Sequence, residues 1–181
     1  MQRYICLTIC LLLMQWPMAA QQLLGIASKW SDEFTEWEIF TDEEDVVGEL
    51  QLRWPLQGDW TEWDYRIGEE IGTIKLKWKN DPSLWEIRGY DEIVTAKMIW
   101  SNDFREWRIS NNDITLTLKT RYGNVFDEWE VREERHGAFG IYTVWEGDPR
   151  EWEIADELDE ELSLEMRMAL IFIPVFHSFP K

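Results

Sequence analysis

Paired aromatic residues recur along most of this sequence at nearly constant intervals. The second member of each pair is always Trp, at positions 37, 63, 85, 107, 129 and 152, so successive units are 26, 22, 22, 22 and 23 residues apart. The first members are Trp30, Trp54, Trp78, Trp100, Tyr122 and Trp145. Regular spacing of this kind is typical of a fold built from copies of one supersecondary unit. We therefore expect six such units.

Each unit has the pattern of two β-strands joined by a turn. From Gly72 to Trp78 every second residue is apolar, and Trp85 and Ile87 alternate with charged residues in the returning segment. Alternation with period two is the pattern of a half-buried strand. A four-residue turn predicts that Trp78 lies opposite Trp85, Leu76 opposite Ile87 and Lys77 opposite Glu86. The same register pairs Arg53 with Asp64, Lys29 with Glu38 and Arg121 with Glu130.

The tryptophans of the repeat share the apolar face, and two interpretations follow. Burial in a core is the favoured one, because eleven of the 13 Trp occupy repeat positions on that face. The alternative is that Trp side chains are exposed and stack on a carbohydrate. Trp60 lies outside the repeat, in the longer turn from Pro55 to Glu62, and is predicted to contact a partner.

Twelve strands in simple up-and-down order would form a sheet with one wholly apolar face, which must close or be covered. Closure gives a barrel about 24 Å across, too wide for strand side chains alone to fill. The segment of about residues 160–176 is apolar on all sides from Met166 onward, except for Arg167. A helix of this kind belongs in a core. We therefore predict a mainly β fold, a twelve-stranded antiparallel barrel closed around a C-terminal hydrophobic helix.

The first twenty residues have the layout of a secretory signal peptide. Arg3 precedes the apolar run from Ile5 to Met14, and the small residues at 19 and 20 are typical of a cleavage site. The single barrel domain is therefore expected to comprise residues 21–181, without Cys6 and Cys10. The expected location is secreted, periplasmic or elsewhere in the cell envelope.

The charge balance excludes one large class of partner. The chain has 36 acidic and 18 basic residues and a net charge of −18. Nucleic-acid binding needs clustered Lys and Arg, so it is not expected. Up-and-down topology gathers many acidic turns, from Asp42–Asp45 to Asp156–Glu161, at one end of the barrel. This acidic end is either a divalent-cation site, a docking surface for a basic protein, or a set of solvated turns.

The layout resembles the superfamily of tubby, phospholipid scramblase and LURP-one-related proteins. The resemblance rests on the hairpin from Glu92 to Ile109 and on the ending from Asp156 to Ala169. It implies a twelve-stranded barrel around a central C-terminal helix. For scramblases it also implies a calcium response through an acidic segment before that helix, with Asp148, Asp156 and Asp159 as candidate ligands, although positions 150, 152 and 154 between them carry no carboxylate.

The sequence shows no arrangement typical of an enzyme. His136 and His177 have no nucleophile at a suitable spacing, and both cysteines lie in the predicted signal peptide. We expect a secreted or periplasmic, non-catalytic binding or structural protein with no cofactor other than possible calcium. The alternative is a cation-dependent protein that associates with a membrane surface, in the manner of a scramblase or lipid sensor.

Overall fold

The structure is a computed structural model that describes residues 22–43, 45–90, 92–123, 125–133 and 135–180. The predicted signal peptide of residues 1–20, with both cysteines, lies outside these ranges. Within them, no helix combines the length and the apolar character needed to cross a membrane.

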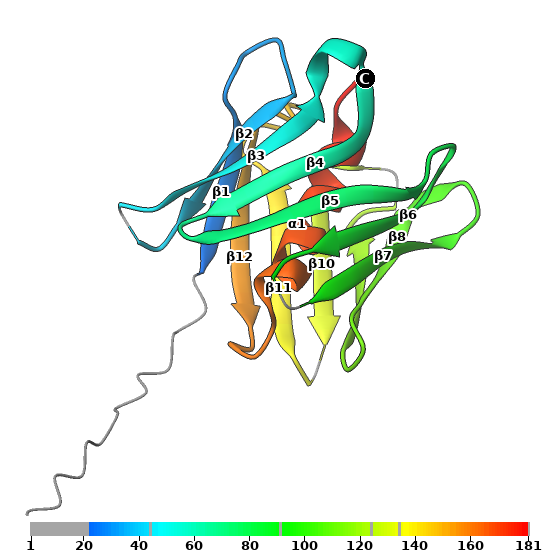
Figure 1. Ribbon diagram of the computed structural model, residues 1–181. Helices are drawn as coiled ribbons and strands as arrows, with labels where there is room; N and C mark the ends of the chain where they lie inside the picture. Colours follow the sequence, from blue (N-terminus) through cyan, green and yellow to red (C-terminus); the bar gives the residue numbers. More distant parts are fainter. Residues whose placement is uncertain (1–21, 44, 91, 124, 134, 181) are drawn as a thin grey trace, which may run out of the picture.

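Twelve antiparallel strands form a closed barrel, as the sequence predicted (Figure 1). Each strand pairs with its neighbours in sequence, and β1 pairs with β12 to close the sheet, with Gly25 opposite Glu153. The strands are β1 (Leu23–Ser28), β2 (Glu36–Thr41), β3 (Val47–Trp54), β4 (Asp59–Ile67), β5 (Glu70–Trp78), β6 (Asp81–Arg88), β7 (Ile93–Trp100), β8 (Asp103–Ser110), β9 (Thr115–Thr120), β10 (Glu128–Glu133), β11 (Gly137–Thr143) and β12 (Glu151–Leu158), with the short 3-10 helix η1 (Pro55–Gln57) between β3 and β4.

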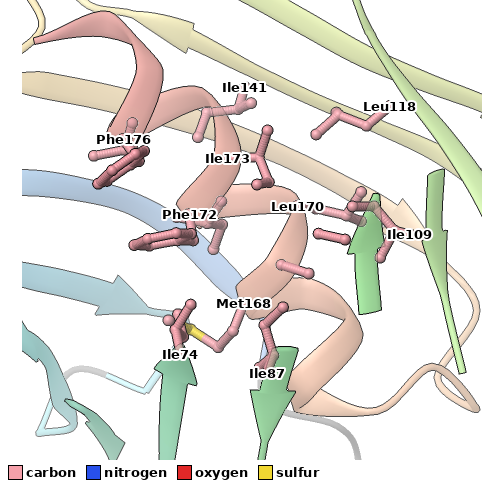
Figure 2. Packing of buried hydrophobic residues seen from close by; sticks show 14 of the residues in the cluster. Ile74, Ile87, Ile109, Leu118, Ile141, Met168, Leu170, Phe172, Ile173 and Phe176 are labelled. Carbon is pink, nitrogen blue, oxygen red and sulfur yellow. The ribbon is translucent and has the colours of Figure 1, made fainter. Parts of the chain in front are cut away.

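The helix α1 (Leu164–Ser178) runs through the interior of the barrel (Figure 1). Figure 2 shows its side chains reaching strands around the wall, for example Met168 beside Ile74 and Ile87. Every residue from Glu165 to Phe176 is buried, which confirms the predicted central helix. The helix begins four residues later than predicted, because the Ser163 side chain caps it by accepting a hydrogen bond from the Met166 amide.

The second Trp of every unit is buried, with at most 1% of its surface exposed. In five units the indole Nε1 donates a hydrogen bond to the backbone carbonyl three residues earlier, at 2.8–3.1 Å, and the carbonyl belongs to Phe34, Trp60, Phe104, Phe126 or Pro149. Trp85 is the exception, since its Nε1 has no partner among the described residues. This local bond satisfies the hydrogen-bond donor of a buried side chain.

The hairpin register differs from the prediction by two residues. Leu76 lies opposite Trp85, and Ile74 opposite Ile87. The turn is tighter than expected, because Trp78 already pairs with Asp81, and a bulge then places three residues of β6 against one of β5. A shift of two residues preserves the faces of both strands. Lys77 therefore still reaches Glu86, at 2.9 Å.

Candidate functional site: an aromatic rim at one end of the barrel

The first aromatic residue of every unit is exposed, so the prediction that all repeat tryptophans are buried is wrong. The exposed fractions run from 45% for Trp54 to 67% for Trp145. All six residues lie at the hairpins β1–β2, β3–β4, β5–β6, β7–β8, β9–β10 and β11–β12, which the up-and-down order places at one end of the barrel. We call this set the aromatic rim: Trp30, Trp54, Trp78, Trp100, Tyr122 and Trp145.

The hairpin bulges explain why the rim residues are exposed. The inward-facing residues of β5 are Ile74 and Leu76, and continued alternation would turn Trp78 inward as well. In three hairpins, however, the register shifts just before the rim Trp, between Leu52 and Trp54, Leu76 and Trp78, and Met98 and Trp100. A bulge bends the strand and re-aims the side chain that follows it.

Carboxylates hold several rim indoles by their ring nitrogens. Trp100 Nε1 donates a hydrogen bond to Glu106 at 2.6 Å, and Trp30 and Trp54 donate to Glu36 and Glu62 at 3.4 Å. Each of these acids directly precedes the buried Trp of its unit. In the fifth unit Arg121 lies over the Tyr122 ring, 5.6 Å from its centroid. Rim side chains are therefore held in place while much of their surface faces solvent.

Grooves with charged walls lie beside the rim aromatics. One of about 330 Å³ is lined by Trp30 and Trp145, together with Lys29, Arg150 and Glu151. A second, of about 250 Å³, is lined by Trp100, Arg105, Glu106 and Lys119, among others. Each groove thus combines an indole with hydrogen-bond donors and acceptors, which is the composition of a site for a polar ligand with an apolar face.

The mouth of the barrel inside the rim is closed by aromatic packing. Phe179, just after α1, stacks on Phe34 at 4.8 Å between ring centroids and contacts Trp60 at 5.7 Å. Trp60, the predicted partner contact, is half-buried and also packs against Trp63. The structure therefore places Trp60 in the plug that closes the mouth, beside the rim rather than in it.

The three candidate calcium ligands are not brought together. Asp148 lies in the β11–β12 hairpin, where its carboxylate binds Arg150, whereas Asp156 lies near the other end of β12. Asp156 is buried and pairs with Arg167 at 2.8 Å, and Asp159 is exposed, 3.7 Å from His136 Nδ1. Among the residues that the structure describes, no group of three His, Cys, Asp or Glu side chains is arranged to hold a metal ion.

A buried carboxyl group marks the opposite end of the barrel, where α1 begins. Glu165 is 8% exposed, and its carboxylate lies so close to Gly89 that a Cβ there would be 1.5 Å from Glu165 Oε1. Burial raises the pKa of Glu165, and the negative charges of Glu92 and Glu70 raise it further. Ionised Glu165 therefore opposes folding.

Replacing Glu165 with Gln is expected to stabilise the protein at neutral pH. A pKa raised in the folded state costs stability as the pH rises from the unfolded pKa, about 4.3, through the folded value. The variant should therefore melt at a higher temperature than the wild type near pH 7, and the difference should shrink toward about pH 4. Thermal melts across this range test it, with Glu161→Gln, exposed in the preceding turn, as the control. An equal difference in melting temperature at about pH 4 and about pH 7 would contradict a raised pKa for Glu165.

No family model, curated protein or solved structure matches this chain. The class of protein is therefore defined by the structure alone, as a closed twelve-stranded barrel with a central helix and an aromatic rim. Sequence reasoning missed the rim because it assumed unbroken alternation through each hairpin. A usable signal was present, since a Glu precedes the buried Trp in five of the six units and suits an exposed indole partner.

Proposed function

We propose that this chain is a non-catalytic binding protein that acts outside the cytoplasm and holds a neutral carbohydrate chain on its aromatic rim. The observation that carries the proposal is the exposure of one aromatic ring per unit, six in all, beside charged hydrogen-bonding groups. Exposed apolar surface that recurs at equivalent places indicates a binding role. The location rests on the predicted signal peptide.

Carbohydrate chemistry matches the two kinds of group at the rim. The C–H face of a sugar ring stacks on an indole, and its hydroxyl groups bond to carboxylates and guanidinium groups. Twelve strands place the aromatic side chains of successive units about 12 Å apart around the wall, so a chain of several sugars would contact more than one of them. A non-covalent site of this kind needs no catalytic group.

The charges at the rim favour a neutral glycan over a membrane surface. Many of the basic residues here are already paired, as Arg105 is with Asp103 and Arg150 with Asp148. Arg53 is likewise bound by Asp64, which raises the pKa of its guanidinium. An anionic bilayer attracts unpaired Lys and Arg. The rim offers separate aromatic rings among paired charges instead of a continuous apolar patch.

We also retain kinship with the tubby, scramblase and LURP-one-related superfamily as a proposal. Its support is the closed barrel of twelve strands around a C-terminal helix. A scramblase-like, calcium-dependent role would require lipid binding, so co-sedimentation with vesicles in the presence and absence of calcium tests this alternative.

Binding of oligosaccharides tests the proposal directly. Hexasaccharides of glucose, N-acetylglucosamine, xylose and mannose are titrated by calorimetry and by tryptophan fluorescence. At least one should bind, and the double variant Trp30→Ala, Trp145→Ala should weaken it about tenfold or more. Leu56→Ala is the matched control, because Leu56 is fully exposed on η1 and outside the rim.

Two results would overturn the proposal. One is the absence of binding to every sugar tested. The other is co-sedimentation with phosphatidylcholine vesicles only when calcium is present, which would instead support the lipid-associated alternative.

A further inference from the structure

The outer wall of the barrel has two separate regions of opposite charge. Strands β11, β12, β1 and β2 contain no Lys or Arg, and their outward positions include Glu38, Glu151, Glu153 and Glu157. We call these four residues the acidic wall. Strands β7 and β9 contain no Asp or Glu, and the outward charges of β7, β8 and β9 include Lys97, Arg108 and Lys119. We call these three the basic wall.

Like charges face each other directly on the basic wall. Lys97 of β7 lies opposite Arg108 of β8 in the register. Their other cross-strand neighbours, Leu84 and Thr117, are uncharged, and neither cation forms an ion pair with a described residue. Like charges directly opposite each other destabilise a sheet. Lys119 adds a third cation on the next strand. Its two opposite neighbours are acidic, but Glu106 is bound by Trp100 and Glu130 is paired with Arg132.

The acidic wall has the corresponding excess of the other sign. Glu38 and Glu151 both lie opposite Ala27, one on each side of β1. Glu153 lies between Gly25 and Tyr142, so that no cation balances it across either neighbouring strand. None of the four acids forms an ion pair with a described basic residue.

The two walls lie on separate parts of the barrel surface. In the closed order of twelve strands, β8 is six strands from β2, and it is four strands from β12, which carries three of the four acids. Figure 1 shows the same arrangement, with β1, β2 and β12 on one side of the view and β7 and β8 on the other. Because the acidic and basic walls are three strands or more apart, they cannot pair with each other within a single chain.

We propose that the partner of each wall is a second copy of this chain, with the basic wall of one molecule against the acidic wall of the next. Contact of unlike patches is head-to-tail, so it propagates into a row of barrels unless it closes into a ring. The net charge of −18 opposes association at long range. At about 0.15 M salt the Debye length is about 8 Å, so the facing walls dominate the contact. The walls share Glu151 and Lys119 with the grooves beside the aromatic rim, but the six rim aromatics and the four residues substituted below are not shared.

Paired charge reversals test the proposal. Lys97→Glu with Arg108→Glu makes both walls acidic, and Glu38→Lys with Glu153→Lys leaves the acidic wall with no net charge. In sedimentation velocity at about 0.15 M salt, the wild type should form concentration-dependent oligomers that dissociate at about 1 M salt. Each double variant alone should remain a monomer, and an equimolar mixture of the two should associate again.

Control variants change the net charge equally but outside the walls. Lys79→Glu with Arg135→Glu matches the first double variant, and Glu146→Lys with Glu161→Lys matches the second, since all four residues are exposed in turns. Both controls should still associate with themselves. Far-UV circular dichroism and melting curves establish that each variant is folded.

Three results would overturn the proposal. They are a wild type that stays monomeric from low to high concentration, association that persists in either wall variant, and a mixture that fails to associate. Binding of heparin to a monomeric wild type, lost in Lys97→Glu with Arg108→Glu, would assign the basic wall to a polyanion instead. Oligosaccharide titrations on the same variants measure carbohydrate binding at the rim separately. If the association proposal is contradicted, the carbohydrate proposal is therefore still decided by its own experiment.

Discussion

Replacing Trp107 with Ala is expected to lower the free energy of unfolding by about 3–5 kcal/mol. Trp107 has none of its surface exposed, packs against Phe104 and His177, and donates its Nε1 hydrogen to the Phe104 carbonyl. Truncation would remove this packing, leave a cavity beside α1 and free a carbonyl group. A loss of this size is a large part of the total stability of a typical domain.

Trp100→Ala is the matched control, since Trp100 lies seven residues earlier in the same hairpin and is 60% exposed. Its removal should cost less than about 1 kcal/mol, because a single exposed side chain contributes little to packing. Urea unfolding followed by far-UV circular dichroism measures both. Equal losses for the two variants would mean that the rim and the core do not differ as described.

Replacing Asp156 with Asn is expected to cost about 3–5 kcal/mol, the usual effect of leaving one member of a buried ion pair without its partner. Arg167 is 4% exposed, and its guanidinium bonds to the Asp156 carboxylate at 2.8 Å and to the backbone carbonyl groups of Leu162 and Asp159. Arg167 thereby connects the end of β12 to the entrance of α1. An amide at position 156 would keep the shape but not the charge.

Asp159→Asn is the control for this substitution. Asp159 is exposed and follows Asp156 by three residues, so its neutralisation should change the unfolding free energy by no more than about 0.5 kcal/mol. Chemical denaturation at neutral pH compares the two variants. A small loss for Asp156→Asn would show that Arg167 is sufficiently bound by the backbone alone.

Most of the fold could be predicted from the sequence because alternation and repetition are local signals. Ile74, Leu76 and their equivalents point inward as expected, and the apolar stretch from Met166 to Phe176 is inside the barrel. The exact pairing of residues across each hairpin depends on the geometry of the turn, which the alternation of polar and apolar side chains does not determine. The bulge after Leu76 therefore changed both the pairing and the direction of Trp78.

The role of Asp156 could not be read from its neighbours in sequence. An Asp near other acids is consistent with a cation site, but its partner Arg167 lies eleven residues later, on α1. Only the return of the helix into the barrel brings the two charges together. The aromatic rim was missed for a different reason, since its exposure depends on hairpin bulges that interrupt the alternation of the strands.

The position of α1 inside the wall has a consequence for biosynthesis. The helix follows all twelve strands in the chain, so the wall has no filling until synthesis has passed β12. Nascent chains that stop earlier expose the inner indoles to other molecules and are prone to aggregate. Chaperones should therefore be needed most before residues 164–178 emerge from the ribosome. Chains that terminate before these residues should be insoluble.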